Sequence, residues 1–166
     1  MNRPLPFDPI ARAAELWEER IGPSSTMAAV TGIMRVQQII QSAVDGALKS
    51  HGLTFARYEA LVLLTFSRNA SLPMRVMGER LQLHPTSVTN IVDRLEKDGL
   101  VKRVPHLTDR RTTLVEITDD GRQRHAQATD AVTGMDFGMR GLTPRQTQQL
   151  IELLTKVRKS VGDFAD

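Results

Sequence analysis

The sequence lacks cysteine, and this absence excludes several classes of site at once. Without thiols the chain can form no disulfide, no Cys nucleophile and no Cys-ligated zinc or iron–sulfur cluster. Aromatic residues make up only 4% of the 166 residues, so we do not expect a stacking platform for single-stranded nucleic acid. The longest strongly apolar run, residues 60–66, is far shorter than the roughly 20 residues that a membrane-spanning helix needs.

A strong charge of one sign is also missing. The chain has 22 Lys+Arg and 19 Asp+Glu, a formal net charge of +3, which does not by itself indicate a nucleic-acid partner. The N-terminal residues lack the apolar core of a signal peptide, so we expect a soluble, cytoplasmic protein with no membrane partner. The length fits one domain with an extra arm, and 40% apolar residues suffice for a packed core.

What is present is mostly helical periodicity. Apolar residues recur at helical spacing in residues 9–21, in residues 25–50 and from Pro144 onward, with N-cap signals at Asp8, Thr118 and Thr143. The helices predicted at the two ends are amphipathic, but the small middle of the chain cannot cover the apolar faces of both. We therefore expect the ends to pack together and against a second copy.

The middle of the chain combines short helices with two strands. Residues 55–66, 74–81 and the segment from about Pro85 to Gly99 are predicted helices, with Thr54 as the cap of the first. The turn at 82–84 gives the last two the spacing of a helix-turn-helix. Residues 101–104 and 113–117 are rich in β-branched side chains and flank a polar segment, which predicts a two-stranded hairpin.

The helix that starts at Pro85 has two different faces. Its buried face holds Val88, Ile91, Val92 and Leu95. Its other face carries Thr86, Ser87, Thr89, Asn90, Asp93, Arg94 and Lys97. A solvated face is usually rich in Glu and Lys, whereas a helix in a major groove uses short polar groups for base edges and cations for phosphates. On its own, this helix fits a capped surface helix equally well.

Positive charge is concentrated in the same region. Residues 94–111 contain six cations and three acids, so this segment alone carries +3, the net charge of the whole chain. The pair Arg110 and Arg111 lies at the predicted hairpin tip, and arginine is favoured in a narrow minor groove because the potential there is strongly negative. The combination predicts a winged helix-turn-helix.

Residues 83–103, the triplet Asp109-Arg110-Arg111, and Leu114 to Thr118 followed by Gly121 resemble the MarR family of bacterial transcription regulators. The order of elements is similar to that family over nearly the whole chain. The resemblance implies a mainly α fold with a small β-hairpin wing. It divides the chain into N-terminal extension and dimerisation helices (1–53), a winged helix-turn-helix (54–118) and C-terminal dimerisation helices (119–166). It also implies a homodimer that represses transcription at a pseudo-palindromic double-stranded operator, with no cofactor.

The same resemblance assigns the DNA-binding residues. Arg111 is expected to enter the minor groove, with Asp109 orienting it through a salt bridge and Arg110 adding a groove or phosphate contact. The recognition-helix residues are Thr86, Ser87, Thr89, Asn90 and Arg94, and the candidate phosphate contacts are His84, Lys97 and Arg103. Asn90 is suited to a bidentate contact with adenine.

An effector is the second implication of the resemblance. Family members bind small, often aromatic or anionic ligands, and the extra N-terminal helix is similar to that of the urate-responsive subgroup. By that similarity Trp17, Glu59 and Arg103 form a candidate effector pocket. Asn90 stands where the subgroup has arginine, which removes a charge partner for an anion. Packing is the alternative role of Trp17.

Other functions find little support in the sequence. The four histidines show no metal-ligand spacing, no glycine-rich phosphate loop is present, and the length leaves no room for a catalytic domain, so we predict no metal site and no enzyme. One alternative is a winged helix used for protein–protein interaction, which would need an apolar or acidic exposed helix face. The other is a regulator that binds DNA without responding to a ligand.

Overall fold

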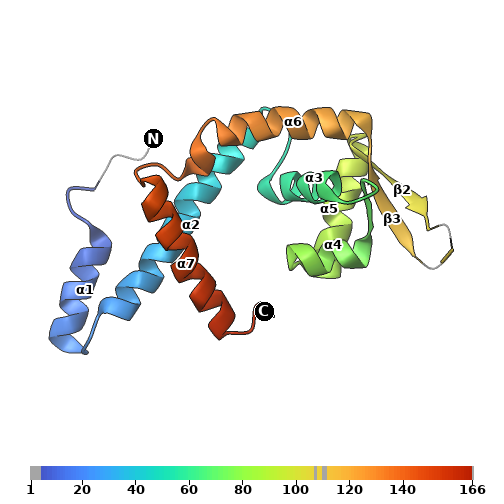
Figure 1. The fold of residues 1–166 in the computed structure, drawn as a ribbon. Helices are drawn as coiled ribbons and strands as arrows, with labels where there is room; N and C mark the ends of the chain where they lie inside the picture. Colours follow the sequence, from blue (N-terminus) through green and yellow to red (C-terminus); the bar gives the residue numbers. More distant parts are fainter. Residues whose placement is uncertain (1–4, 107, 110–111, 166) are drawn as a thin grey trace.

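The computed structural model describes residues 5–106, 108–109 and 112–165 (Figure 1). The elements in chain order are α1 (Pro9–Arg20), α2 (Ser25–Lys49), α3 (Phe55–Phe66), β1 (Ser71–Pro73), α4 (Met74–Leu81), α5 (Pro85–Lys97), β2 (Val101–Pro105), β3 (Thr113–Ile117), α6 (Asp119–Thr133), the 3₁₀ turn η1 (Asp136–Gly138) and α7 (Pro144–Ser160). The prediction of a mainly helical chain with a small β wing is confirmed. No helix within the described part of the chain is both long and apolar enough to cross a bilayer.

The elements form two groups (Figure 1). One group, here called the winged unit, runs from α3 to β3 and contains the helix-turn-helix and the sheet. The other group, the outer helices, consists of α1, α2, α6 and α7. In the view of Figure 1, α6 lies along the top of the molecule and joins the winged unit on the right to the outer helices on the left.

The sheet has one strand more than the sequence predicted. It is antiparallel with the order β1-β3-β2, so β3 is the central strand and β1 pairs with its edge opposite β2. Leu72 lies opposite Val115, and Pro73 lies opposite Leu114. Proline is tolerated here because β1 is an edge strand. A strand of three residues is too short to show an alternating pattern, and from the sequence alone Leu72-Pro73 fits the opening of α4.

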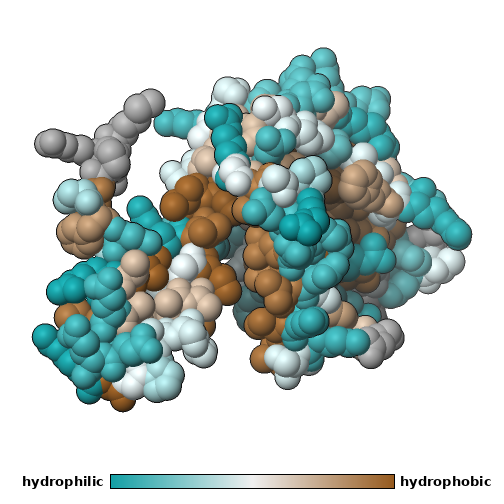
Figure 2. All heavy atoms as spheres, turned by 60° about the vertical axis from the view of Figure 1, so that its left-hand side comes forward, coloured by the Kyte–Doolittle hydropathy of each residue, from teal (hydrophilic) through white to brown (hydrophobic). Residues whose placement is uncertain are grey.

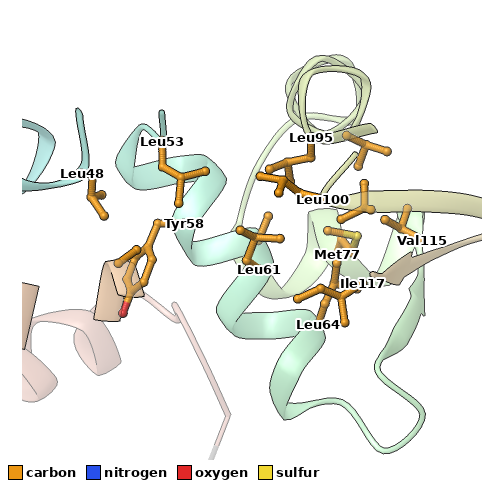
Figure 3. Packing of buried hydrophobic residues seen from close by; sticks show 14 of the residues in the cluster. Leu48, Leu53, Tyr58, Leu61, Leu64, Met77, Leu95, Leu100, Val115 and Ile117 are labelled. Carbon is orange, nitrogen blue, oxygen red and sulfur yellow. The ribbon is translucent and has the colours of Figure 1, made fainter. Parts of the chain in front are cut away.

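The core of the winged unit is made where α3, α4, α5 and the sheet meet (Figure 3). Leu61 and Leu64 of α3 meet Met77 of α4 and Leu95 of α5 there, and none of the four is exposed. Val88 and Val92 extend the buried face of α5, while Ile91 is only half-buried. The predicted apolar face thus anchors α5 in the core and leaves the opposite face of the helix exposed to solvent.

The end of α5 is fixed by a Schellman motif. The Gly99 N–H donates to the Glu96 carbonyl (3.0 Å) and the Leu100 N–H donates to the Leu95 carbonyl (2.9 Å). Gly99 has φ +73°, a left-handed conformation that costs glycine no Cβ clash. Leu95 and Leu100 are both buried, which supplies the apolar contact that accompanies this motif.

The start of α6 is locked to the same turn. Thr118 donates its hydroxyl to the Gly99 carbonyl (2.7 Å) and accepts from the Gly121 N–H (3.0 Å), which is the predicted cap. A Cβ on Gly121 would lie 2.1 Å from the Leu100 carbonyl oxygen, so only glycine fits. The Thr118 and Gly121 pair therefore holds α6 against the end of α5.

Most predicted helix caps are confirmed, and one is replaced. Asp8 caps α1, and Thr143 forms a capping box with Gln146 at α7. Thr54 takes the N-cap position of α3, but its side chain makes no cap bond with the described residues. Instead Asp45 of α2 accepts from the Phe55 N–H at 2.9 Å. This bond connects an outer helix directly to the winged unit.

The outer helices leave much of their apolar surface uncovered. All residues of α1 and α7 are described, and none of them is buried. Of the 25 residues of α2, only Val44 and Leu48 are buried. Figure 2 shows apolar side chains gathered around a hollow in the middle of the face that it presents. A groove of about 670 Å³ lies between α2, η1 and α7, and its lining includes Ile33, Val36, Ile40, Phe55, Leu150 and Leu154.

Candidate nucleic-acid interface

The turn between α4 and α5 sets the position of the recognition helix. Gln82 ends α4 in the left-handed conformation, and the Gln82 and Leu83 N–H groups both donate to the Gly78 carbonyl. His84 is the N-cap of α5, and its Nδ1 accepts from the Thr86 N–H at 3.3 Å. The short turn and the cap define where α5 begins.

His84 can serve as a cap and still reach DNA. Because Nδ1 accepts a hydrogen bond, the ring proton of the neutral imidazole belongs on Nε2. The side chain is exposed, so Nε2 stays available as a donor to a phosphate oxygen. The capping role and the predicted phosphate contact are therefore compatible.

The outward face of α5 presents short polar groups at its start. Thr86, Thr89 and Asn90 are exposed, and Ser87 is half-buried. The Thr89 hydroxyl donates to the Pro85 carbonyl (3.0 Å), so its oxygen keeps lone pairs for an external donor. The Asn90 amide offers both donors and an acceptor, which is the set that reads adenine in a major groove.

The cations of residues 94–111 divide into two kinds. Lys102 of β2 pairs with Glu116 of β3 (2.8 Å), and Arg103 is held by acids of α5. Arg94 and Lys97 are exposed, and the side chain of neither makes an ion pair or hydrogen bond within the described part of the chain. Arg110 and Arg111 lie outside the described residues. On α5, therefore, Arg94 and Lys97 are the cations free to meet phosphates.

Arg103 fastens the wing to the recognition helix. Its guanidinium lies 2.5 Å from the Asp93 carboxylate and also pairs with Glu96, while its backbone N–H donates to Glu96 at 2.9 Å. Desolvation lowers the pKa of Arg103, but the hydrogen bonds and charges of Asp93 and Glu96 outweigh it, so the net shift is upward. The predicted roles of Arg103 at a phosphate or an effector must compete with these two carboxylates.

His106 and Asp109 make hydrogen bonds within the described part of the wing loop. The His106 Nδ1 accepts from the Thr108 and Asp109 N–H groups (3.3 and 3.2 Å), and Asp109 accepts from the Thr112 hydroxyl (2.6 Å). No role for His106 is predicted from the sequence, although a side chain that bonds nearby backbone is a common turn device. The predicted role of Asp109 is to orient Arg111, which lies outside the described residues. Among the described residues, the Asp109 carboxylate accepts a hydrogen bond from Thr112.

The three candidate effector residues are not brought together within one chain. Trp17 is on α1 and Arg103 is on β2, and these elements lie at opposite ends of the molecule (Figure 1). Glu59 of α3 is half-buried, and desolvation raises its pKa. An acid in this setting does not attract an anion, although its protonated form could donate a hydrogen bond.

Comparison with known proteins agrees with this geometry. The sequence pattern of the MarR family matches residues 51–112. The chain is 48% identical in sequence to Sco5413, a MarR family transcriptional regulator from Streptomyces coelicolor with a solved crystal structure. The match covers 86% of this chain and 99% of that one, with a TM-score of 0.78. The chain belongs to the MarR family.

Other MarR proteins share the fold at lower identity. E. coli MarR, solved as a variant in complex with operator DNA, is 26% identical, with a TM-score of 0.72 over 86% of this chain and 97% of that one. CouR from Rhodococcus jostii, solved with p-coumaroyl-CoA, is 28% identical, with a TM-score of 0.66 over 75% of this chain and 87% of that one. The curated regulator PapX from E. coli is 31% identical over 53% of this chain. The chain spans about half the length of that relative, 54%.

The Arg103 network predicts a specific stability difference. Replacing Arg103 with Met keeps its apolar stem but removes the pairs with Asp93 and Glu96, which should lower the free energy of unfolding by about 1 to 2 kcal/mol. The matched control is Lys102→Met on the same strand, which breaks one exposed pair and should cost about 0.5 kcal/mol or less. Urea denaturation of both variants measures the difference. Equal small losses would show that Arg103 does not fasten the wing.

Proposed function

We propose that the protein is a homodimeric, sequence-specific regulator of transcription, a repressor that binds a pseudo-palindromic double-stranded operator in the cytoplasm. Each protomer places α5 in a major groove and its wing in the adjoining minor groove. The supporting observation is the outward face of α5. It combines short polar side chains at the N-terminal end with Arg94 and Lys97 further along, which pair with none of the described side chains, on a helix anchored by a buried apolar face.

The residues have distinct roles in this proposal. Thr86, Ser87, Thr89 and Asn90 contact base edges and nearby phosphates. Arg94 reaches a base or a phosphate. Lys97 and the His84 Nε2 contact phosphates, which position the protein without reading sequence. Arg110 and Arg111 extend the contact into the minor groove. Arg103 acts mainly by holding the wing against α5.

A second copy is supported by the shape of α7. Leu150 and Leu154 line the groove toward α2. Leu153, Val157 and Val161 follow one another at four-residue intervals along the same apolar stripe, and each is well exposed, at 60%, 59% and 77%. The stripe is therefore only partly covered within one chain, and its exposed part needs a second partner. We propose that the second partner is the outer helices of a twin protomer, related by a two-fold axis that matches the symmetry of the operator.

The protein–protein alternative has less support. A winged helix that binds another protein would present an apolar or acidic surface on α5, whereas the exposed side chains there are Pro85, Thr86, Thr89, Asn90, Asp93, Arg94 and Lys97. Only one of these is acidic, and none is a large apolar residue. Apart from Phe66 of α3, the exposed large apolar residues lie on the outer helices or in the segments beside them, where they support self-association.

The proposed function also includes release of the operator DNA by a small ligand. CouR has been solved with p-coumaroyl-CoA, so a MarR protein of this fold can hold an aromatic, anionic ligand. In this chain the groove between α2, η1 and α7 reaches Phe55 at the start of α3 and also contains Arg140. A small anionic aromatic ligand there would touch both the outer helices and the winged unit. It could then favour one relative placement of the two over another.

The wing assignment predicts a change in salt dependence. Arg111→Ala should weaken operator binding and flatten the slope of log K against log salt concentration by about one for each phosphate that the wing no longer neutralises. The control is Arg12→Ala, which removes the same charge from an exposed ion pair on α1. Fluorescence anisotropy across a salt series measures both. An unchanged affinity and slope for Arg111→Ala would contradict the wing assignment.

The dimer assignment predicts a linked loss of assembly and DNA binding. Leu153→Glu combined with Val157→Glu places two charges in the exposed apolar stripe of α7, so sedimentation velocity should show a monomer that binds the operator weakly. Gln148→Glu combined with Gln149→Glu adds the same charge on exposed polar positions of α7 and should leave the dimer intact. A stripe variant that stays dimeric would contradict the proposed interface.

The ligand proposal predicts release of operator DNA by anionic aromatics. Salicylate and urate, titrated against the protein–operator complex, should lower the apparent affinity, and Arg140→Gln should raise the concentration required by about tenfold, as expected for a lost charge-assisted hydrogen bond. Trp17→Phe tests the α1 residue in parallel. If neither compound released DNA, the ligand-independent regulator would be favoured and Trp17 would be a packing residue.

A further inference from the structure

A polar contact joins two segments that are far apart in the chain. Gln82, in the turn between α4 and α5, donates its side-chain N–H to Asp163 Oδ1 at 2.8 Å. Asp163 lies just beyond α7, and its other oxygen accepts from Arg158 Nε at 2.6 Å. One carboxylate thus joins the end of the last outer helix to the turn of the helix-turn-helix.

The backbone at the end of α7 is built to hold Asp163 in place. The Gly162 N–H donates to the Lys159 carbonyl (3.1 Å), and the Asp163 N–H donates to the Arg158 carbonyl (3.1 Å). Gly162 has φ +72°, so this is the same Schellman motif that ends α5 at Gly99. In the usual motif the residue after the glycine makes an apolar contact with the last turn. Here an ion pair between Asp163 and Arg158 takes that position.

The Gln82 end of the contact is equally fixed. Gln82 has left-handed φ and ψ, and its N–H is bonded to the Gly78 carbonyl, so the side chain leaves the turn in a defined direction. The hydrogen bonds from Gln82 and Arg158 hold the pKa of Asp163 below its ordinary value, so the carboxylate is charged at neutral pH. The Arg158 guanidinium is also placed over the Phe164 ring, 5.1 Å from its centroid.

The position of this contact matters because the other connections lie elsewhere on the winged unit. Asp45 of α2 binds the Phe55 N–H at the start of α3, and Arg124 of α6 donates to the His51 carbonyl at 2.7 Å, just before α3. Tyr58 of α3 and Thr129 of α6 are also hydrogen-bonded (3.1 Å). These bonds hold the α3 side of the winged unit, and Thr118 holds the C-terminal end of α5 at the Gly99 carbonyl, but none of them reaches the turn between α4 and α5. Asp163 attaches at the turn that leads into α5.

We propose that Asp163 is a positioning residue that fixes the tilt of α5 relative to α7, and that it thereby sets the half-site spacing that the dimer accepts. This inference rests on the proposed function, because spacing has meaning only for a dimer with two recognition helices. With α7 in the dimer interface, a contact from its end to the turn before α5 couples the geometry of the interface to the outward polar face of α5. Without the contact, each winged unit could rotate to follow a shorter or longer operator.

The test compares operators that differ only in spacing. A selected operator and versions with one base pair inserted or removed between half-sites are titrated with wild type, Gln82→Ala, Asp163→Ala and the double variant. Gln82→Ala retains a Cβ, so it adds no new restriction at the left-handed position. The preference of each single variant for the correct spacing should fall by about three- to tenfold, the net contribution of one exposed hydrogen bond. The double variant should lose no more than either single one.

The matched control is Glu152→Ala, which removes a carboxylate of α7 that accepts from the Gln148 amide within the same helix. It should leave the spacing preference unchanged. Amide hydrogen exchange without DNA supplies an independent readout. Exchange in residues 78–88 should rise in Asp163→Ala and stay at the wild-type level in Glu152→Ala.

The outcomes separate the positioning role from the proposed function. If the wild type binds the operator and the Gln82 and Asp163 variants keep its full spacing preference, the positioning role is wrong and the proposed function stands. If the wild type binds no duplex in the series, the proposed function is wrong, and the positioning role fails with it. Loss of affinity by the same factor at every spacing would also overturn the positioning role, because it would indicate a general structural defect.

Discussion

The apolar surface that one chain leaves uncovered constrains the whole molecule. The buried core lies mainly in the winged unit, at residues such as Leu61, Met77 and Leu95, and α2 and α6 add a few residues to it. The other outer helices add none: every residue of α1 and α7 is described and none is buried. Because apolar burial is the main driving force of association, these helices require a partner. In the proposed homodimer a second copy is this partner, and the pair has the two-fold symmetry of the proposed pseudo-palindromic operator.

Within the winged unit, short-range contacts hold the recognition helix at both ends. The Gln82 turn and the His84 cap fix its start, while the Gly99 turn, Thr118 and Gly121 fix its end against α6. Arg103 then ties the wing to the same helix. In the proposed function, side chains as short as Thr86 and Asn90 read base edges, which requires a backbone that is placed accurately. The buried face of α5 and these terminal contacts supply that placement.

The features predicted correctly from sequence are those whose signals are local. The bounds of α4 and the caps at Asp8, Thr118 and Thr143 follow from residues within one helical turn, and the structure confirms them. The missed features depend on partners distant in the chain. β1 exists only because β3 pairs with it, Asp45 replaces Thr54 as the cap of α3 from another helix, and Gln82 meets Asp163 across 81 positions. The candidate pocket of Trp17, Glu59 and Arg103 rests on a resemblance alone, and one chain does not assemble it.

The charge of the segment 94–111 also has a clearer meaning in three dimensions. Lys102 and Arg103 neutralise acids of the chain itself, whereas Arg94 and Lys97 face outward beside the short polar groups of α5. The proposed function requires two such surfaces to act together on one operator. Selection of bound duplexes from a random DNA pool by the full chain tests this requirement most directly. We expect an inverted repeat with half-sites about 10 base pairs apart from centre to centre, bound by a dimer. Enrichment of single half-sites bound by a monomer, or of no sequence at all, would contradict it.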